Sequence, residues 1–119
     1  MSYNKNNIFA KILRKEANAE VIYENEYVFC FKDIFPKAKI HILIIPKSEY
    51  TDIYDFSKNA SSEEKESIFV AFDNLIELFK LDKKGCRIIT NFGIDGRQEV
   101  EHLHFHFLGG QDIGNMISL

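Results

Sequence analysis

Hydrophobic and polar residues follow two different periods along the chain, and each period predicts a different kind of element. Apolar residues at helical spacing follow Asn7, a favourable N-cap, and predict a short helix over about 7–16. A second helical pattern follows an acidic first turn at Ser61 and predicts a long amphipathic helix to about Leu81. Runs rich in β-branched and aromatic residues predict strands over 19–23, 27–31, 40–45, 86–90 and 99–108.

The order of these elements predicts the fold class. Helix, strands, helix and strands, without an internal repeat, indicate one α+β domain with a mainly antiparallel sheet. The strand over 40–45 is almost continuously apolar, which is typical of a central strand covered on both faces, and His41 is its exception. Between the elements, 48–58 is predicted to be a loop with a short helix. The stretch 91–98 contains two glycines and is predicted to be a loop that can approach a ligand closely.

Composition and charge narrow the class of protein. The 119 residues, 45% of them hydrophobic, fit one domain. With 15 Lys and Arg against 18 Asp and Glu, the net charge of −3 gives no overall basic field for nucleic acid or an anionic membrane. No apolar run is long enough for a membrane span or a signal-peptide core. Cys30 and Cys86 are predicted to be buried free thiols, so we expect a soluble cytoplasmic protein.

All four histidines of the chain lie in two of the predicted strands. His41 is in the apolar strand, and His102, His104 and His106 alternate in the last one. Because strand side chains have period two, the last three imidazoles are expected to face one way. One interpretation is an ordinary exposed polar face. Such faces use Lys, Glu, Thr and Ser as readily as His, so three histidines in succession would be a coincidence.

Two chemical interpretations of the histidine strand compete with that one. Zinc binds imidazole nitrogens, but residues four apart on a strand are separated by ~13 Å, and no Cys-x-x-Cys or His-Glu-x-x-His motif supplies further ligands. Catalysis at phosphorus fits better. Histidine, with an ordinary pKa near ~6.5, can attack as a neutral base while a protonated neighbour holds a phosphate oxygen.

At this point the sequence resembles a known family. His-x-His-x-His followed by two apolar residues is similar to the motif of the histidine triad family. Segments 8–12, 31–36 and 41–47, together with Asn91, also resemble that family in order and spacing. The resemblance covers about residues 7–110 of a single domain over 1–119, and leaves a short variable tail over 111–119. Leu108-Gly109-Gly110 resembles the Hint branch of nucleoside phosphoramidases, whereas the dinucleoside polyphosphate hydrolase branch usually has Pro-Arg there.

The resemblance implies a histidine triad fold, a homodimer and hydrolysis of purine nucleoside 5′-phosphoramidates, with no metal or organic cofactor. His104 would be the nucleophile and form a covalent nucleotidyl-histidine, and His106 would hydrogen-bond the phosphate. His102 and His41 would order the site, although His41 alone could equally be a buried core histidine. A dinucleoside polyphosphate hydrolase, or a nucleotide-binding regulatory protein with incidental turnover, are the alternatives.

The resemblance also implies a set of nucleotide-binding residues. Asp33 would accept both ribose hydroxyls, with Ile34 beside it, although an Asp at this place often makes only an Asx-turn. An apolar slot for the base would be formed by residues whose spacing also fits a plain core: Phe9, Ile12 and Leu43. The wall on the phosphate side would comprise Asn91, Gly96, Arg97, Gln98 and Glu99.

The chain departs from the Hint pattern at three places. Glu99 stands where many Hint proteins carry a serine thought to help the leaving group. An ionised carboxylate there would repel the phosphate, so we expect Glu99 to be protonated in the complex or to point away. Glu101 is expected to face solvent. The tail over 111–119 lacks the usual Arg and Trp of the family, so leaving-group preference is the property that transfers least.

Overall fold

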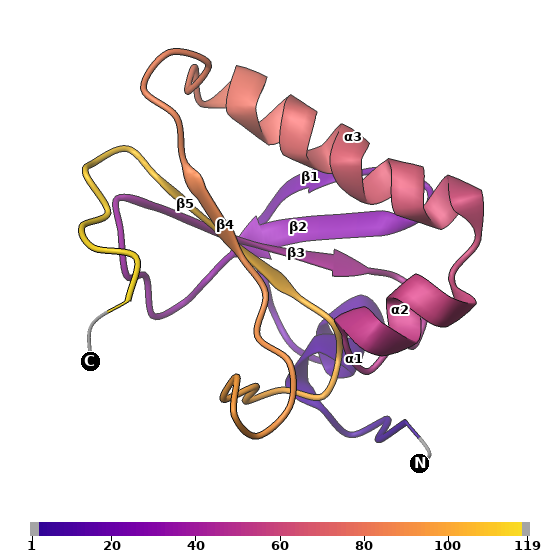
Figure 1. Ribbon diagram of the computed structural model, residues 1–119. Coiled ribbons are helices and arrows are strands. Elements are labelled where there is room, and N and C mark those ends of the chain that lie inside the picture. Colours follow the sequence, from indigo (N-terminus) through magenta and orange to yellow (C-terminus); the bar gives the residue numbers. More distant parts are fainter. Residues whose placement is uncertain (1–2, 118–119) are drawn as a thin grey trace.

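The computed structural model describes residues 3–117, and its elements follow the predicted order (Figure 1). Residues 1–2 of the predicted domain and 118–119 of the predicted tail lie outside the described residues. The elements are α1 (Ile8–Leu13), β1 (Val21–Glu24), β2 (Val28–Lys32), β3 (Ile40–Pro46), α2 (Ile53–Asn59), α3 (Ser62–Leu78), β4 (Arg87–Ile89) and β5 (Phe105–Gly109).

The strands form one five-stranded sheet in the order β1-β2-β3-β5-β4, and every neighbouring pair is antiparallel. The prediction of an α+β fold with a mainly antiparallel sheet and one short and one long helix is confirmed. The short helix predicted within 48–58 is α2, which ends one residue beyond that segment. β3 is the central strand, and six of its seven residues are buried, because both of its faces are covered.

The two faces of the sheet carry different chemistry. Figure 1 shows α3 lying across one face and α1 on the other side of the sheet. Alternate residues of β3 divide between these faces: Ile42 and Ile44 join the main core under α3, whereas Leu43 and Ile45 pack with residues of α1. His41 belongs to the second set by the same alternation. The fold thus places the polar residues of β3 and β5 on the α1 face.

The helices begin where predicted and end earlier. Asn7 accepts a hydrogen bond from the backbone of α1, and Ser61 forms a capping box with Glu64 at the start of α3. Both helices stop about three residues short of the predicted ends. Near those ends Lys15 (φ 64°) and Lys80 (φ 57°) adopt the left-handed conformation, a way to end a helix that glycine usually provides.

The last strand is shorter than predicted. Pairing with β3 and β4 begins only at Phe105 and His106, so His102 and His104 precede β5 instead of lying within it. The backbone N–H of Leu103 donates to the carbonyl of Tyr50 at 2.8 Å, so it is not part of the sheet ladder. The histidine motif therefore runs from a buried loop into a strand.

Both cysteines are free thiols, as predicted, but only Cys30 is fully buried, while Cys86 is half-buried. Between residues 3 and 117, no helix combines the length and the apolar character that crossing a membrane would need.

Candidate active site

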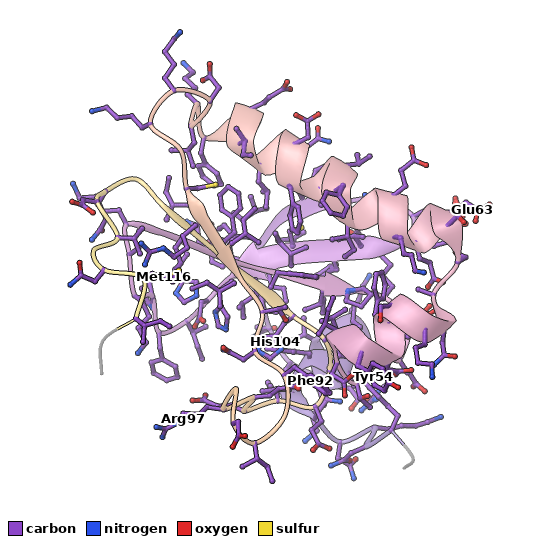
Figure 2. All side chains as sticks on the ribbon, in the orientation of Figure 1. Tyr54, Glu63, Phe92, Arg97, His104 and Met116 are labelled. Atoms are coloured by element: carbon purple, nitrogen blue, oxygen red, sulfur yellow. The ribbon has the colours of Figure 1, made fainter. Side chains whose placement is uncertain are left out.

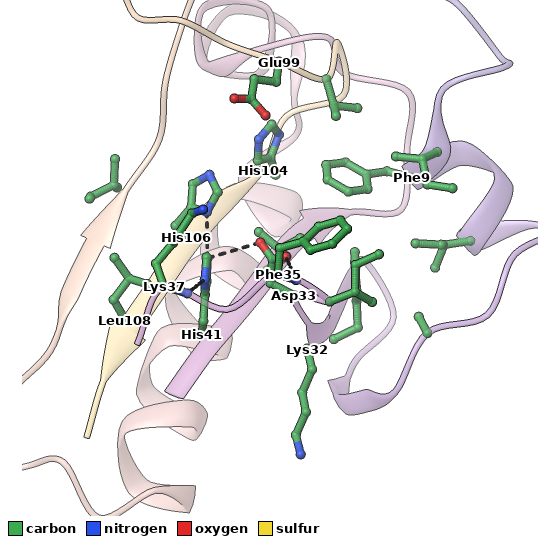
Figure 3. A pocket seen from close by; sticks show the side chains of 18 of the residues that line it. Phe9, Lys32, Asp33, Phe35, Lys37, His41, Glu99, His104, His106 and Leu108 are labelled. Carbon is green, nitrogen blue, oxygen red and sulfur yellow. Dashed lines mark hydrogen bonds and ion pairs between the residues drawn. The ribbon is translucent and has the colours of Figure 1, made fainter. Parts of the chain in front are cut away.

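A cavity of about 780 Å³ lies on the α1 face of the sheet (Figure 3). Its walls come from α1, the segment between α1 and β1, the strands β2 to β5, and the loops between β2 and β3 and between β4 and β5. Eleven of the fourteen residues expected at the site line it: Phe9, Ile12, Asp33, Ile34, His41, Leu43, Asn91, Arg97, Glu99, His104 and His106. The other three, Gly96, Gln98 and His102, are not among its lining residues.

His104 lies in the floor of this cavity, with 5% of its surface exposed. Its Nδ1 is 2.8 Å from the backbone carbonyl oxygen of His102, so Nδ1 carries the proton and donates it to that carbonyl. The lone pair of a neutral imidazole then resides on Nε2. The hydroxyl of Thr90 donates to the backbone carbonyl of His104 at 2.8 Å and fixes the main chain at this point. His104 is thus held in the tautomer whose Nε2 is unprotonated.

His102 supports His104 from behind the cavity and is completely buried. Its Nε2 donates to the carbonyl oxygen of Pro46 at 2.8 Å, and its Nδ1 pairs with the hydroxyl of Tyr3. Both ring nitrogens are therefore satisfied within the protein. The ring of Phe9 meets the rings of both His102 and His104 edge to face, with the shorter centroid separation, 4.9 Å, to His104.

His41 and His106 form a second hydrogen-bonded pair. The backbone N–H of Lys37 donates to Nδ1 of His41 at 3.0 Å, which leaves the proton of a neutral ring on Nε2. That Nε2 lies 2.9 Å from Nδ1 of His106 and 3.3 Å from a carboxylate oxygen of Asp33. His106 then keeps its own proton on Nε2. The pair holds a neutral N–H donor beside His104, since the rings of His104 and His106 are 5.2 Å apart.

Burial keeps the imidazoles uncharged. Burial is the main cause that lowers the pKa of His102 and of His106 to about 4, and in His106 the neighbouring His104 and His41 contribute to this lowering. Burial also lowers the pKa of His104 and of His41 below 6.5, against the opposing charge of Asp33. At neutral pH His106 therefore offers a neutral N–H, not the protonated imidazole considered from the sequence.

Asp33 makes the Asx-turn considered for it from the sequence and also contacts His41. One carboxylate oxygen accepts the backbone N–H of Phe35 at 2.8 Å, which is an Asx-turn, and the other faces His41. Each oxygen has a further lone pair for a ligand hydroxyl. Ile34, with 78% of its surface exposed, and Phe35 both line the cavity next to this carboxylate.

The apolar slot expected for the base is also a small core. Phe9, Ile12 and Leu43 are buried and pack with Phe31 and Ile45 on the α1 face of the sheet. Phe9, Ile12, Leu43 and Phe31 line the cavity at the same time. One side of each residue therefore packs inward and the other side faces the cavity.

The loop between β4 and β5 contributes to the cavity unevenly. Figure 3 shows the Glu99 carboxylate turned toward His104, so it does not point away. Gln98 instead binds the protein itself, because its amide donates to the carbonyls of Thr51 and Val100 at 2.7 and 2.9 Å. A Cβ on Gly96 would lie 2.4 Å from the backbone oxygen of Phe92, so this glycine permits a tight turn.

Three of these side chains could also hold a metal ion. One ligand atom each from Asp33, His41 and His106 lies within 4.8 Å of the others. Carboxylate and imidazole donors suit zinc, and an ion there would replace the Nε2 proton of His41 as the link between the three. This set differs from the His-x-His pair considered from the sequence. The same atoms already satisfy one another by hydrogen bonding, so the geometry needs no ion.

Several cavity and support residues escape sequence reasoning. Tyr3 pairs with His102 across 99 positions of sequence, and no local pattern predicts that contact. The carbonyl of Pro46 and the N–H of Lys37 act through the main chain, which no side-chain pattern reveals. Phe35 could have been found, since it lies inside the segment 31–36 that resembles the family.

Comparison with known proteins agrees with this fold and site. The HIT domain family matches residues 14–113, and the chain belongs to this family. A HIT-like protein of Rickettsia prowazekii is 44% identical over 116 residues, covering 98% of this chain and 97% of that protein. The purine nucleoside phosphoramidase of Escherichia coli is 37% identical over 111 residues, covering 93% of this chain and 92% of that enzyme.

Solved structures show the same architecture. A HIT family hydrolase from Clostridium thermocellum superimposes with a TM-score of 0.86 at 38% identity, covering 97% of this chain and 99% of that one. A histidine triad protein from Clostridium difficile gives a TM-score of 0.84 at 34% identity, covering 98% and 100%. The predicted histidine triad relationship is therefore confirmed, and the protein is a HIT family hydrolase.

Proposed function

We propose that this protein hydrolyses purine nucleoside 5′-phosphoramidates, breaking the P–N bond through a nucleotidyl-histidine intermediate. The observation that carries the proposal is the hydrogen bond from Nδ1 of His104 to the carbonyl of His102, which leaves Nε2 as a base in the cavity. The 37% sequence identity with the purine nucleoside phosphoramidase of Escherichia coli supports the choice of substrate class.

The first step joins the nucleotide to the enzyme. The Nε2 lone pair of His104 attacks the α-phosphorus, the P–N bond breaks, and the amine leaves with the electron pair and takes up a proton from the solvent side. The Nε2–H of His106 donates to a phosphate oxygen as charge grows there. The carbonyl of His102 stabilises the positive charge that His104 acquires, because Nδ1–H already points at it.

The second step releases the nucleotide. A water molecule attacks phosphorus, the P–Nε2 bond breaks, and the electron pair returns to His104 as the water proton is lost to solvent. A nucleoside monophosphate results. Two displacements thus replace one difficult hydrolysis, which is the advantage of a covalent intermediate.

The nucleoside would bind at the α1 end of the cavity. Asp33 would accept the ribose hydroxyls with its remaining lone pairs, and the purine would enter the apolar slot beside Phe9 and Leu43. The slot offers mainly apolar contacts, so we propose no preference between adenine and guanine. Because the imidazole and carboxylate groups satisfy one another, we propose that turnover needs no metal.

We also propose that two copies associate through α3 and the edge strand β4. Phe69 on α3 is 71% exposed and continues an apolar stripe with Phe72 and Ile76 on the side of the helix nearest β5. β4 is the outer strand on that side of the sheet. An exposed apolar helix face on the side of the sheet that ends in an open strand edge suits a second copy of the chain. The two free thiols support a cytoplasmic location.

Hydrolysis of adenosine 5′-phosphoramidate, with and without EDTA, tests the proposed reaction. Wild-type protein is expected to release AMP equally well in EDTA. His104→Ala is expected to lose at least about a thousandfold in kcat while still binding AMP, because only the nucleophile is removed. Absence of wild-type turnover, or unchanged turnover in the variant, would contradict the proposal. Loss of turnover in EDTA would contradict metal independence.

A further inference from the structure

Glu99 is the acidic residue at the mouth of the cavity that the proposed reaction leaves without a role. It is exposed to solvent, yet it lines the cavity. Figure 3 shows its carboxylate next to the His104 ring, on the opposite side of the imidazoles from Asp33. Within residues 3–117, no side-chain hydrogen bond and no ion pair engages this carboxylate. Its charge also acts on the rings, since it favours the protonated forms of both His104 and His106.

The direction of attack places the leaving group near this carboxylate. His104 approaches phosphorus from the floor of the cavity, where it is 5% exposed. An in-line displacement therefore sends the departing amine away from the floor and toward the solvent-filled mouth. Asp33 lies at the other end, with the apolar slot for the nucleoside. The mouth beyond the phosphate is thus bordered by Glu99.

The cations that line the cavity do not neutralise Glu99. Figure 2 shows the Arg97 side chain extending away from His104. Lys32 forms an ion pair with Glu20 at 3.1 Å, and Figure 3 shows its side chain directed away from the imidazoles. Lys37 lies on the side of His41, to which its backbone N–H donates. Because Glu99 is exposed, solvent and salt screen its repulsion of the phosphate, so it can remain charged there without being protonated or pointing away. A leaving group at the mouth then meets a negative charge.

We propose that Glu99 determines leaving-group specificity, favouring phosphoramidates whose amine part carries a positive charge and disfavouring those whose amine part is anionic. The proposal rests on the phosphoramidase function proposed above. An ammonium group on the departing amine would pair with the carboxylate, whereas a carboxylate or a phosphate chain would be repelled. The same charge would act against dinucleoside polyphosphates, whose leaving group is a polyanion.

Three adenosine 5′-phosphoramidates that differ in the far end of the amine test this proposal. Their amines are 1,4-diaminobutane, n-butylamine and 4-aminobutyrate, which end in a cation, a methyl group and an anion. The quantity measured is the ratio of kcat/KM for the cationic substrate to that for the anionic one. Glu99→Gln removes the charge and keeps the shape, and Glu101→Gln removes the charge of an exposed residue that does not line the cavity.

Wild-type protein is expected to prefer the cationic substrate, and Glu99→Gln to reduce the ratio about fivefold at low salt, while Glu101→Gln leaves it unchanged. In 1 M NaCl the wild-type preference should shrink, because an exposed charge is screened within about 3 Å. An unchanged ratio in Glu99→Gln, or an equal fall in Glu101→Gln, would overturn this proposal alone. If wild type hydrolyses none of the three substrates, the proposed function itself fails.

Discussion

The four imidazoles differ in what holds their two ring nitrogens. His104 and His102 each donate a hydrogen bond to a main-chain carbonyl. His41 accepts a hydrogen bond from a main-chain N–H and donates its own Nε2–H to His106. Each bond selects one tautomer. The result is one ring with a lone pair facing the cavity and one ring with an N–H donor beside it, which is the pair that attack on phosphorus requires.

The lowered pKa of His104 predicts the pH dependence of the proposed reaction. The neutral ring attacks, and a lowered pKa keeps the ring neutral at more acidic pH. We therefore expect kcat/KM for adenosine 5′-phosphoramidate to stay level as pH falls from 8 to 6.5 and to decline only below that. A rate profile, compared with NMR titration of the His104 ring, measures this. A decline centred at or above pH 6.5 would contradict it.

Individual site residues can be predicted from the sequence where a side chain acts directly, and less well where the main chain acts. Most of the expected residues line the cavity, because segments that resemble the family in sequence occupy the corresponding places in the fold. Gln98 is different: its amide is bonded to Thr51 and Val100, and only the folded loop reveals those partners. Tyr3 reaches His102 from a distant part of the chain.

The beginnings of the helices are predicted more accurately than their ends. Caps at Asn7 and Ser61 have side-chain signatures, and both are found as expected. Helix ends at lysines in the left-handed conformation have none, since glycine is the residue that usually marks them. In the same way the alternation of residues 102–108 continues beyond the strand, so period alone extends β5 too far toward its N-terminus.

The exposed side of α3 gives a prediction about association. Replacing Phe69 with Glu puts a charge in the apolar stripe that faces β5. Leu78→Glu changes a residue of the same helix that is also exposed, 57%, but lies outside the stripe. Wild type and Leu78→Glu are expected to sediment at twice the chain mass of 13.9 kDa, and Phe69→Glu as a monomer. Analytical ultracentrifugation decides. A monomeric wild type, or a dimeric Phe69→Glu, would refute the proposed interface.

In the molecule as a whole, the sheet separates the main hydrophobic core from the candidate active site. The face under α3 is filled by apolar residues of β2, β3 and β5, and the α1 face holds the cavity with its buried histidines. The alternating histidines of the last predicted strand indicated this division, because every second residue of a strand faces the same layer. The cavity itself could not be predicted, since its shape depends on how the loops between β2 and β3 and between β4 and β5 close over it.

The buried histidines predict a loss of stability in acid. His102 has a pKa of about 4 when folded and near 6.5 when unfolded, so only the unfolded chain gains its proton as pH falls from 6.5 toward 4. For His102 alone this lowers the free energy of unfolding by about 2 kcal/mol between pH 7.5 and 5. Urea unfolding at the two pH values measures it.

A matched variant separates this effect from general acid sensitivity. His102→Gln keeps a polar side chain without a group that titrates in this range. Its stability at pH 7.5 is expected to be lower, because the bonds to Pro46 and Tyr3 are disturbed, but its further loss at pH 5 should be smaller than in wild type. An equal loss in both proteins would show that other groups govern the acid response.

The main-chain partners of His102 and His104 have a consequence for how the protein can change. A carbonyl oxygen is present whatever amino acid occupies position 46 or 102, so a single codon change cannot delete either acceptor. The tautomer of His104 is therefore fixed by the path of the backbone and not by the side chain at a neighbouring position. The residues at the cavity mouth act through their side chains and can be exchanged one at a time. If the proposed reaction holds, laboratory evolution toward new amines can start there and leave the tautomer of His104 unchanged.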